Sequence, residues 1–380
     1  METEGCFMES NRFFPEIRGN FGFGMMRLPM VGEEVDIPQT REMVDAFLAA
    51  GFNYFDTAHV YIGGRSETAI REVLSSRYPR ERFVLANKLT GSCFESREEI
   101  LPLFESQLEA CGVDYFDFFL MHAQNAGLYE KYRRCGAYEI AFDLKRQGRV
   151  RHVGLSFHDK AAVLDRILTD YPELEFVQIQ FNYADYDSPS VESGKVYEVC
   201  ARHNKPVVVM EPVKGGNLVK LPPQAHRVLA DLQGGSDARY ALRYAAGFPQ
   251  MCVVLSGMSD AAQMADNLSF MADFRPLDER EAAAVEQVRE IFRGMNLIQC
   301  TACRYCTDGC PVQIPIPRLF SLYNSKKQFG SESAAEWYGR IAEKQATASA
   351  CVQCGQCEDA CPQHLPVRAL LQDVAEMFGR

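Results

Sequence analysis

Short apolar runs alternate with longer stretches of helical periodicity along the first 275 residues of the chain. The apolar runs predict eight strands, at residues 22–27, 54–55, 83–87, 116–121, 152–155, 176–180, 207–210 and 252–255. Helical patterns are predicted at residues 66–77, 96–111, 129–147, 161–169, 191–203, 237–246 and 260–272. Strands and helices that alternate over roughly 250 residues are typical of a (β/α)8 TIM barrel. We therefore predict an α/β fold of this kind.

A doubly wound parallel sheet is the alternative fold for such an alternation. That fold binds dinucleotides through G-x-G-x-x-G at the start of a helix, and no such sequence opens the first helix here. The barrel is expected to cover residues 1–275. Residues 276–294 are predicted to form a connecting helix, because Asp278 and Glu281 have capping-box spacing and Gly294 suits the end of a helix.

Residues 295–380 contain two copies of the cysteine pattern C-x2-C-x2-C-x3-C-P. This pattern is typical of two [4Fe-4S] clusters, because three thiolates at that spacing bind three irons of one cluster and the fourth cysteine binds the other cluster. One cluster is therefore assigned to Cys300, Cys303, Cys306 and Cys361. The other is assigned to Cys351, Cys354, Cys357 and Cys310.

Zinc and a disulfide framework are the other interpretations of clustered cysteines. Structural zinc usually takes pairs of ligands rather than triplets, and disulfides do not require this repeat. The residues between and after the two copies show helical patterns, with Pro317 and Pro366 at positions that suit the start of a helix. This region resembles the α-helical ferredoxin domains, so we expect a smaller, mostly helical iron-sulfur domain at 295–380.

Composition and charge narrow the classes of partner. The formal net charge is −11, which disfavours nucleic acids and anionic membrane surfaces, because both bind basic patches. No apolar run is long enough to span a membrane, and residues 1–22 lack the pattern of a signal peptide. Reduced thiols and oxygen-sensitive clusters favour a cytoplasmic location. The expected partners are a small-molecule substrate and an external redox partner.

Polar residues follow the apolar runs where a barrel carries its chemistry. Catalytic groups of this fold lie at the C-terminal ends of the strands. Asp56, Lys88 and His122 each follow such a run directly, and Tyr61 lies in the loop after Asp56. Each residue alone also has a structural interpretation, such as an ion pair between Lys88 and Asp56. Together the four residues predict an active site.

The segment Phe55-Asp56-Thr57-Ala58 with Tyr61 and Glu67, followed by Lys88 and His122, resembles the catalytic tetrad of the aldo-keto reductases. The likeness continues through residues 148–156, 178–183, 211–218 and 253–267. The resemblance implies carbonyl reduction, in which Tyr61 donates a proton and His122 orients the carbonyl. A free phenol has a pKa near 10, so Lys88 is expected to lower the pKa of Tyr61, with Asp56 holding Lys88 charged.

The same resemblance implies a nicotinamide site made by Ser156, Gln180, Gly257, Gln263 and Asn267. Three features depart from the family pattern. Phe157 replaces an asparagine, and Met210 replaces an aromatic residue. The segment 256–263 has no cation for the 2′-phosphate of NADP and contains Asp260. NAD(H), NADP(H) and a loss of tight nicotinamide binding therefore all remain open.

Two functions fit these features. The first is an oxidoreductase whose barrel reduces or oxidises a carbonyl or alcohol on a small molecule, coupled to one-electron transfer through two [4Fe-4S] clusters. The alternative is an electron-transfer or redox-sensing protein whose barrel is a docking scaffold with weak or no nicotinamide binding. A flavin would join hydride transfer to single-electron transfer, but no motif indicates one.

Overall fold

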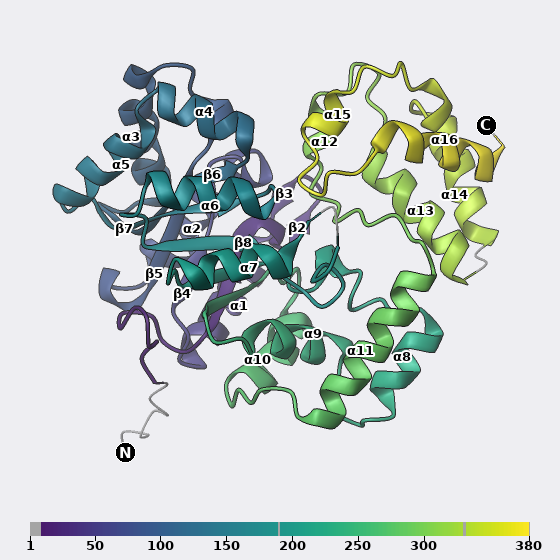
Figure 1. Cartoon of the computed structure of the whole chain (residues 1–380), viewed down its shortest axis with the longest axis horizontal. Coiled ribbons are helices and arrows are strands. Elements are labelled where there is room, and N and C mark those ends of the chain that lie inside the picture. Colours follow the sequence, from purple (N-terminus) through teal and green to yellow (C-terminus); the bar gives the residue numbers. More distant parts are fainter. Residues whose placement is uncertain (1–8, 189–190, 330–331, 380) are drawn as a thin grey trace. The chain divides into compact units, whose positions relative to one another are not determined.

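Eight parallel strands close into a barrel in the computed structural model, which describes residues 9–188, 191–329 and 332–379 (Figure 1). The strands are β1 (Phe21–Gly24), β4 (Tyr54–Asp56), β5 (Val84–Leu89), β6 (Phe116–Gln124), β7 (Val150–Phe157), β8 (Phe176–Gln180), β9 (Val207–Met210) and β10 (Met251–Ser256). Strand β1 closes the barrel by pairing with both β4 and β10. The predicted (β/α)8 barrel is confirmed.

Helices alternate with the strands. They are α1 (Ile37–Ala49), α2 (Arg65–Ile70), α3 (Ile100–Cys111), α4 (Ala126–Arg134), α5 (Ala137–Arg146), α6 (Ala161–Asp170), α7 (Ser193–Arg202), α8 (Pro223–Ala230), α9 (Asp237–Ala246) and α10 (Ala261–Met271). The single helix predicted at 129–147 is wrong. Gly136 has a φ of 64°, a left-handed conformation that interrupts the helix and separates α4 from α5.

The segment after β1 also differs from the prediction. The strand ends at Gly24, and Met25–Arg27 form a turn of 3-10 helix instead of continuing the predicted strand 22–27. An unpredicted hairpin follows, made by β2 (Met30–Val31) and β3 (Glu34–Val35). The carboxylate of Asp36 then accepts a hydrogen bond from the backbone of Gln39 and caps α1.

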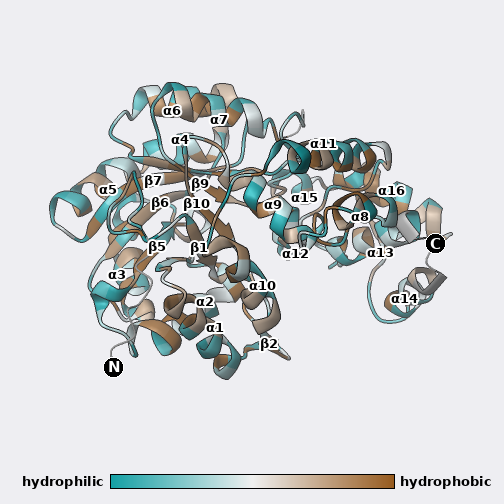
Figure 2. Cartoon of the chain, turned by 90° about the horizontal axis from the view of Figure 1, so that it is seen from below, coloured by the Kyte–Doolittle hydropathy of each residue, from teal (hydrophilic) through white to brown (hydrophobic). Residues whose placement is uncertain are grey.

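The interior of the barrel is filled by apolar side chains, and its strands are mostly brown in the hydropathy view of Figure 2. The segment before β1 closes the end of the barrel where the strands begin. Its Phe14 and Ile17 pack with Phe118 and Phe176, which lie near the starts of β6 and β8. This arrangement leaves the opposite end, where the strands finish, for polar side chains.

The chain forms two compact units. The barrel unit contains Met1–Phe181, Ser193–Pro212 and Leu242–Leu277. The cluster unit contains Asn182–Glu192, Val213–Ala241 and Asp278–Arg380, so the segments that follow β8 and β9 belong to it. Its other helices are α11 (Glu279–Gly294), α12 (Tyr305–Asp308), α13 (Ile316–Phe329), α14 (Glu332–Ala342), α15 (Gln356–Asp359) and α16 (Val367–Phe378). The mostly helical C-terminal part is confirmed, and the domain limits 1–275, 276–294 and 295–380 stay a prediction.

Helix α11 has the capping box expected from its sequence. The Asp278 carboxylate accepts from the backbone of Glu281 at 2.8 Å, and the Glu281 carboxylate accepts from the backbone of Asp278 at 2.9 Å. The helix ends at Gly294, the last residue of the predicted connecting helix 276–294, and packs against α8 (Figure 1). None of the helices in the described ranges is both long and apolar enough to cross a membrane.

Candidate active site and cluster cavities

Asp56 and Lys88 form a buried ion pair where β4 and β5 end. The Lys88 Nζ atom lies 2.6 Å from Asp56 Oδ1 and donates a second bond to the Thr57 carbonyl at 2.6 Å. Gln178 Nε2 donates to Asp56 Oδ2 at 3.3 Å. Burial raises the pKa of Asp56 and lowers the pKa of Lys88, and the contact between the two opposes both shifts. The Lys88 ammonium and the Asp56 carboxylate therefore stabilise each other's charge, and Thr57 and Gln178 hold the pair in place.

Tyr61 lies beside this pair, with Lys88 Nζ 4.7 Å from the centre of its ring. Burial, together with the negative charges of Asp56 and Glu211, holds the pKa of Tyr61 well above its usual value. The positive charge of Arg27 acts in the opposite direction and lowers this pKa. The expected lowering of the Tyr61 pKa by Lys88 is thus not seen. The physical reason is that the Asp56 carboxylate, whose Oδ1 lies 2.6 Å from Lys88 Nζ, offsets the positive charge of Lys88. Tyr61 is a protonated phenol at neutral pH.

His122, in β6, is the fourth member of the site. Its ring meets that of Tyr61 edge-on at 6.0 Å between centroids. The Nδ1 atom lies 2.8 Å from the hydroxyl of Thr90. Burial, together with Lys88 and His158, holds the pKa of His122 well below its ordinary value, so the imidazole is neutral. The four residues predicted from the sequence therefore lie together around one buried point.

A second layer of buried polar side chains supports Lys88 from behind. Asn87 Oδ1 accepts from the Lys88 backbone N–H at 2.8 Å, and Gln107 Nε2 donates to the Lys88 carbonyl at 3.0 Å. Both amides also donate to the buried carboxylate of Glu67, at 2.8 and 3.2 Å. His59 contacts the other oxygen of that carboxylate at 2.9 Å. The network holds the β5 backbone that carries Lys88.

Three of the residues predicted to bind nicotinamide are buried, Ser156 and Gln180 near the ends of β7 and β8 and Asn267 in the middle of α10. The Ser156 hydroxyl accepts from the backbone N–H of Ala123 at 2.8 Å, and Asn267 donates to the Ser256 hydroxyl at 2.8 Å. Among the described residues, Gln180 Nε2 has no hydrogen-bond partner although the side chain is buried. A buried amide donor without a partner fits a ligand that carries an acceptor, such as a carboxamide oxygen.

The other two predicted residues lie after β10. Gln263 is near the start of α10, where its backbone and side chain donate to the Asp260 carboxylate at 2.8 and 2.7 Å. Asp260 thereby occupies the N-terminus of α10, a position that would otherwise favour a phosphate. Gly257 lies against the side chain of Arg27, since a β-carbon at Gly257 would be 3.3 Å from it. The side chain of Arg27, from the 3-10 turn after β1, therefore lies beside segment 256–263.

Sequence reasoning missed Thr90, Gln107 and Arg27. Thr90 follows β5 two residues after Lys88, so the two-residue period of a strand places it on the same side. That signal was available. Gln107 and Arg27 are separated in the chain from the groups they contact by 19 and 230 residues, and no local pattern links them.

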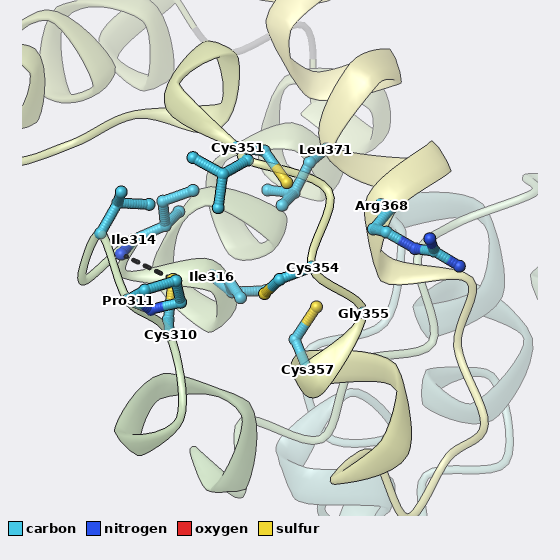
Figure 3. Close-up of a pocket in the computed structure, with 12 residues that line it drawn as sticks. Cys310, Pro311, Ile314, Ile316, Cys351, Cys354, Gly355, Cys357, Arg368 and Leu371 are labelled. Atoms are coloured by element: carbon cyan, nitrogen blue, oxygen red, sulfur yellow. Dashed lines mark hydrogen bonds between the residues drawn. The ribbon is translucent and has the colours of Figure 1, made fainter.

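The eight cysteines of the C-terminal patterns line two cavities in the cluster unit. One cavity is lined by Cys310, Cys351, Cys354 and Cys357 (Figure 3). The other is lined by Cys300, Cys303, Cys306 and Cys361. Each cavity therefore takes three cysteines from one copy of the pattern and the fourth from the other copy, which is the grouping expected from the sequence.

The surroundings of both cavities suit a [4Fe-4S] cluster. Isoleucine, leucine and proline side chains form much of their walls, and backbone N–H groups of Ala302 and Ile314 approach the sulfurs of Cys300 and Cys310 at 3.4 Å. Burial, with three neighbouring cysteines, raises the pKa of Cys306 to about 12. Four thiolates placed so closely repel one another, so a cationic centre is needed to bring them together.

The comparisons with known proteins agree with the fold. A solved aldo-keto reductase from Klebsiella pneumoniae, in complex with NADPH, superposes with a TM-score of 0.61 at 18% identity, over 75% of this chain and 96% of that one. An aldo-keto reductase of Mycobacterium avium is 25% identical over 273 residues, or 70% of this chain and 87% of the relative.

A relative from Mycolicibacterium smegmatis, also described as an aldo-keto reductase, is 30% identical over 143 residues, which is 37% of this chain and half of the relative's length. The pattern of the 4Fe-4S dicluster domain matches residues 299–365. The pattern of the Aldo/keto reductase family matches residues 20–290, most of the chain. The protein is therefore an oxidoreductase with an iron-sulfur domain, and it belongs to the aldo/keto reductase family.

Proposed function

We propose that this oxidoreductase interconverts a carbonyl and an alcohol on a small molecule at the barrel site, and that its two clusters exchange electrons with a one-electron partner. Two features of the same chain carry the proposal. Asp56, Tyr61, Lys88 and His122 converge on a buried point, and eight cysteines of the same chain group around two cavities.

The chain's own residues supply the proton and orient the carbonyl. A Thr90 hydroxyl that donates to Nδ1 leaves His122 with its proton on Nε2, where the neutral ring donates to the carbonyl oxygen. Tyr61 then donates the proton to that oxygen. The phenolate that remains lies next to the Lys88 ammonium, whose orientation is held by Asp56 and by the Thr57 carbonyl.

A nicotinamide is the proposed hydride carrier: when bound, it would supply one hydrogen with two electrons to the carbonyl carbon, while the proton for the oxygen comes from Tyr61. The complex of the Klebsiella pneumoniae relative with NADPH supports this choice. Gln180, through its unpaired Nε2 atom, and Ser156 would hold the carboxamide. Gly257, Gln263 and Asn267 would lie along the rest of the nucleotide, and Arg27 provides a cation beside Gly257.

Each [4Fe-4S] cluster exchanges one electron, so the two together would supply the two electrons that, with one proton, return the oxidised nicotinamide to its hydride-carrying form. Cys300, Cys303, Cys306 and Cys361 would hold one cluster. Cys310, Cys351, Cys354 and Cys357 would hold the other. The presence of both domains in one chain supports a coupling between the two kinds of chemistry.

One observation favours the second function, an electron-transfer protein whose barrel binds nicotinamide weakly or not at all. The Asp260 carboxylate occupies the N-terminus of α10, so it repels a phosphate there. The two functions differ in what they predict for nucleotide binding, which can be measured without knowing the substrate.

The test combines nucleotide titration with a tyrosine variant. Anaerobic protein is titrated with NADH and NADPH, followed by nucleotide fluorescence, and assayed with a panel of aldehydes and ketones. We expect binding at micromolar concentration, and we expect Tyr61→Phe to abolish carbonyl reduction while nucleotide affinity stays within about twofold, because only a proton donor is removed.

Tyr78→Phe is the matched control, since Tyr78 lies outside the site and donates to Asp45. The reductase proposal fails if neither nucleotide binds at millimolar concentration. It fails equally if Tyr61→Phe retains the wild-type rate.

A further inference from the structure

The two halves of the iron-sulfur region are structural copies of each other. Ala302 and Gln353, the equivalent residues between the first and second cysteines, have positive φ angles of 55° and 60°. A short helix follows in each half, α12 and α15, and then a long one, α13 and α16. Equivalent positions of the two halves can therefore be compared directly.

In the first half, protein covers the loop between the first two cysteines. Thr301 is 1% exposed, and the segment Val213–Asn217, which continues β9, lies on it. A β-carbon at Gly215 would be 2.4 Å from the Thr301 carbonyl, so only glycine allows this approach. Asn217 Nδ2 donates to the Cys300 carbonyl at 2.9 Å.

The covering segment is itself held firmly within the cluster unit. Lys214, fully buried, forms an ion pair with Asp185 from the segment that continues β8. Asn182 donates to the other oxygen of Asp185 at 2.8 Å. The loop between Cys300 and Cys303 therefore contacts the segment that follows β9 directly, and the Lys214–Asp185 ion pair links that segment to the one that follows β8.

In the second half, the equivalent loop is open to solvent. Val352 takes the place of Thr301 and is 58% exposed, although it also lines the cavity of Cys310, Cys351, Cys354 and Cys357. Cys354 is exposed, whereas its equivalent Cys303 is half-buried. An apolar side chain that touches the cavity on one side and solvent on the other suits a small, transient contact, the type that redox partners make.

We propose that the loop Cys351–Gly355 is the docking site of a small one-electron carrier protein. Each encounter moves one electron from the reduced carrier to the cluster held by Cys310, Cys351, Cys354 and Cys357, and leaves the carrier oxidised. The electron then passes to the cluster of the first half, and two encounters deliver two electrons. This docking site rests on the proposed function of the clusters. It is placed on the second half because the equivalent loop of the first half is already covered by the segment Val213–Asn217.

The test measures bleaching of the cluster absorbance after anaerobic mixing with photoreduced flavodoxin or with a reduced two-cluster ferredoxin, in the absence of substrate and nucleotide. We expect Val352→Asp to slow this reduction at least about tenfold, because a charge in the centre of an apolar contact must be desolvated. Reduction by dithionite, which requires no docking, should stay unchanged.

Val31→Asp is the matched control, since Val31 in β2 is also exposed, at 67%, and belongs to the barrel unit. If Val352→Asp loses iron, Gln353→Glu repeats the test at the neighbouring exposed position, and we expect the same slowing. The proposal is overturned if neither carrier reduces wild-type protein, if the loop variants match wild type, or if Val31→Asp is equally slow. Because no carbonyl is reduced in this assay, its outcome is separate from that of Tyr61→Phe.

Discussion

The imidazole of His122 is oriented by a single short contact with the hydroxyl of Thr90, 2.8 Å from Nδ1. Its pKa lies well below the ordinary value, because the ring is buried near Lys88, and the ring is therefore neutral at neutral pH. The contact with Thr90 occupies Nδ1, so we propose that Nε2 is the nitrogen left for the substrate.

We expect Thr90→Val to lower kcat for carbonyl reduction about tenfold, because the loss of one hydrogen bond to a buried ring costs about 1 kcal/mol or slightly more. Nucleotide affinity should not change. Thr90→Ser keeps the hydroxyl and should retain most of the activity. Steady-state kinetics with both variants checks this, and equal activity of Thr90→Val and wild type would contradict it.

Among the secondary elements, the N-terminal segment before β1 is joined to the barrel by charge as well as by packing. His152, near the start of β7, lies 2.6 Å from Glu16 and 2.8 Å from Glu175, and its ring packs against Phe14. Burial alone would lower the pKa of His152, but the two carboxylates outweigh burial and raise it to about 9. The ring is therefore cationic at neutral pH.

This arrangement predicts a stability that depends on pH. The unfolded chain has a histidine pKa of about 6.5, so the contribution of His152 is complete below that value and is lost as the pH rises through about 9. It amounts to at most about 3 kcal/mol. We expect the difference in unfolding free energy between wild type and His152→Gln to be largest near about pH 6 and to shrink above about pH 9.

Anaerobic denaturant unfolding across this pH range measures the difference directly. Subtracting the variant from wild type removes the contributions of other titrating groups that are distant from His152. His203→Gln is a control, since that histidine lies near the exposed residue Asp165 on the outside of the barrel unit. A difference that stays constant with pH would show that His152 contributes only packing.

For the whole molecule, the crossed grouping of the cysteines ties the two halves of the iron-sulfur region together. Cys361 belongs to the second copy of the pattern in sequence and to the cavity of the first copy in space. We expect Cys361→Ala to damage the cluster held by Cys300, Cys303 and Cys306, so that iron falls from about eight to between four and about seven per chain.

The second cluster should remain, with its own signal in the electron paramagnetic resonance spectrum of the reduced protein. Iron analysis and this spectrum check the expectation together. Cys93→Ala is the control, because Cys93 lies in the barrel unit and outside both cavities. Selective loss of the cluster of Cys351, Cys354 and Cys357 would show that the fourth ligands are not exchanged.

Local patterns in the sequence were sufficient to locate the eight barrel strands, the four residues that converge at the barrel site and the cysteine groups. Apolar periodicity predicts a strand because alternate side chains must be buried, and ligand spacing predicts a cluster because a cubane has fixed dimensions. Both are properties of a few neighbouring residues. Asp56, Lys88 and His122 could be found for the same reason, since the end of each strand is visible in the chain.

Only the tertiary structure decided which distant groups meet. Barrel closure brings Gln178 to Asp56 and Arg27 to Gly257, and packing joins Asn217 to Cys300. It also decided that the Lys88 charge is offset by Asp56 and that Thr301 is covered while Val352 is open. These facts depend on how complete elements pack, because burial and electric fields are set by all the atoms around a group and not by its neighbours in the chain.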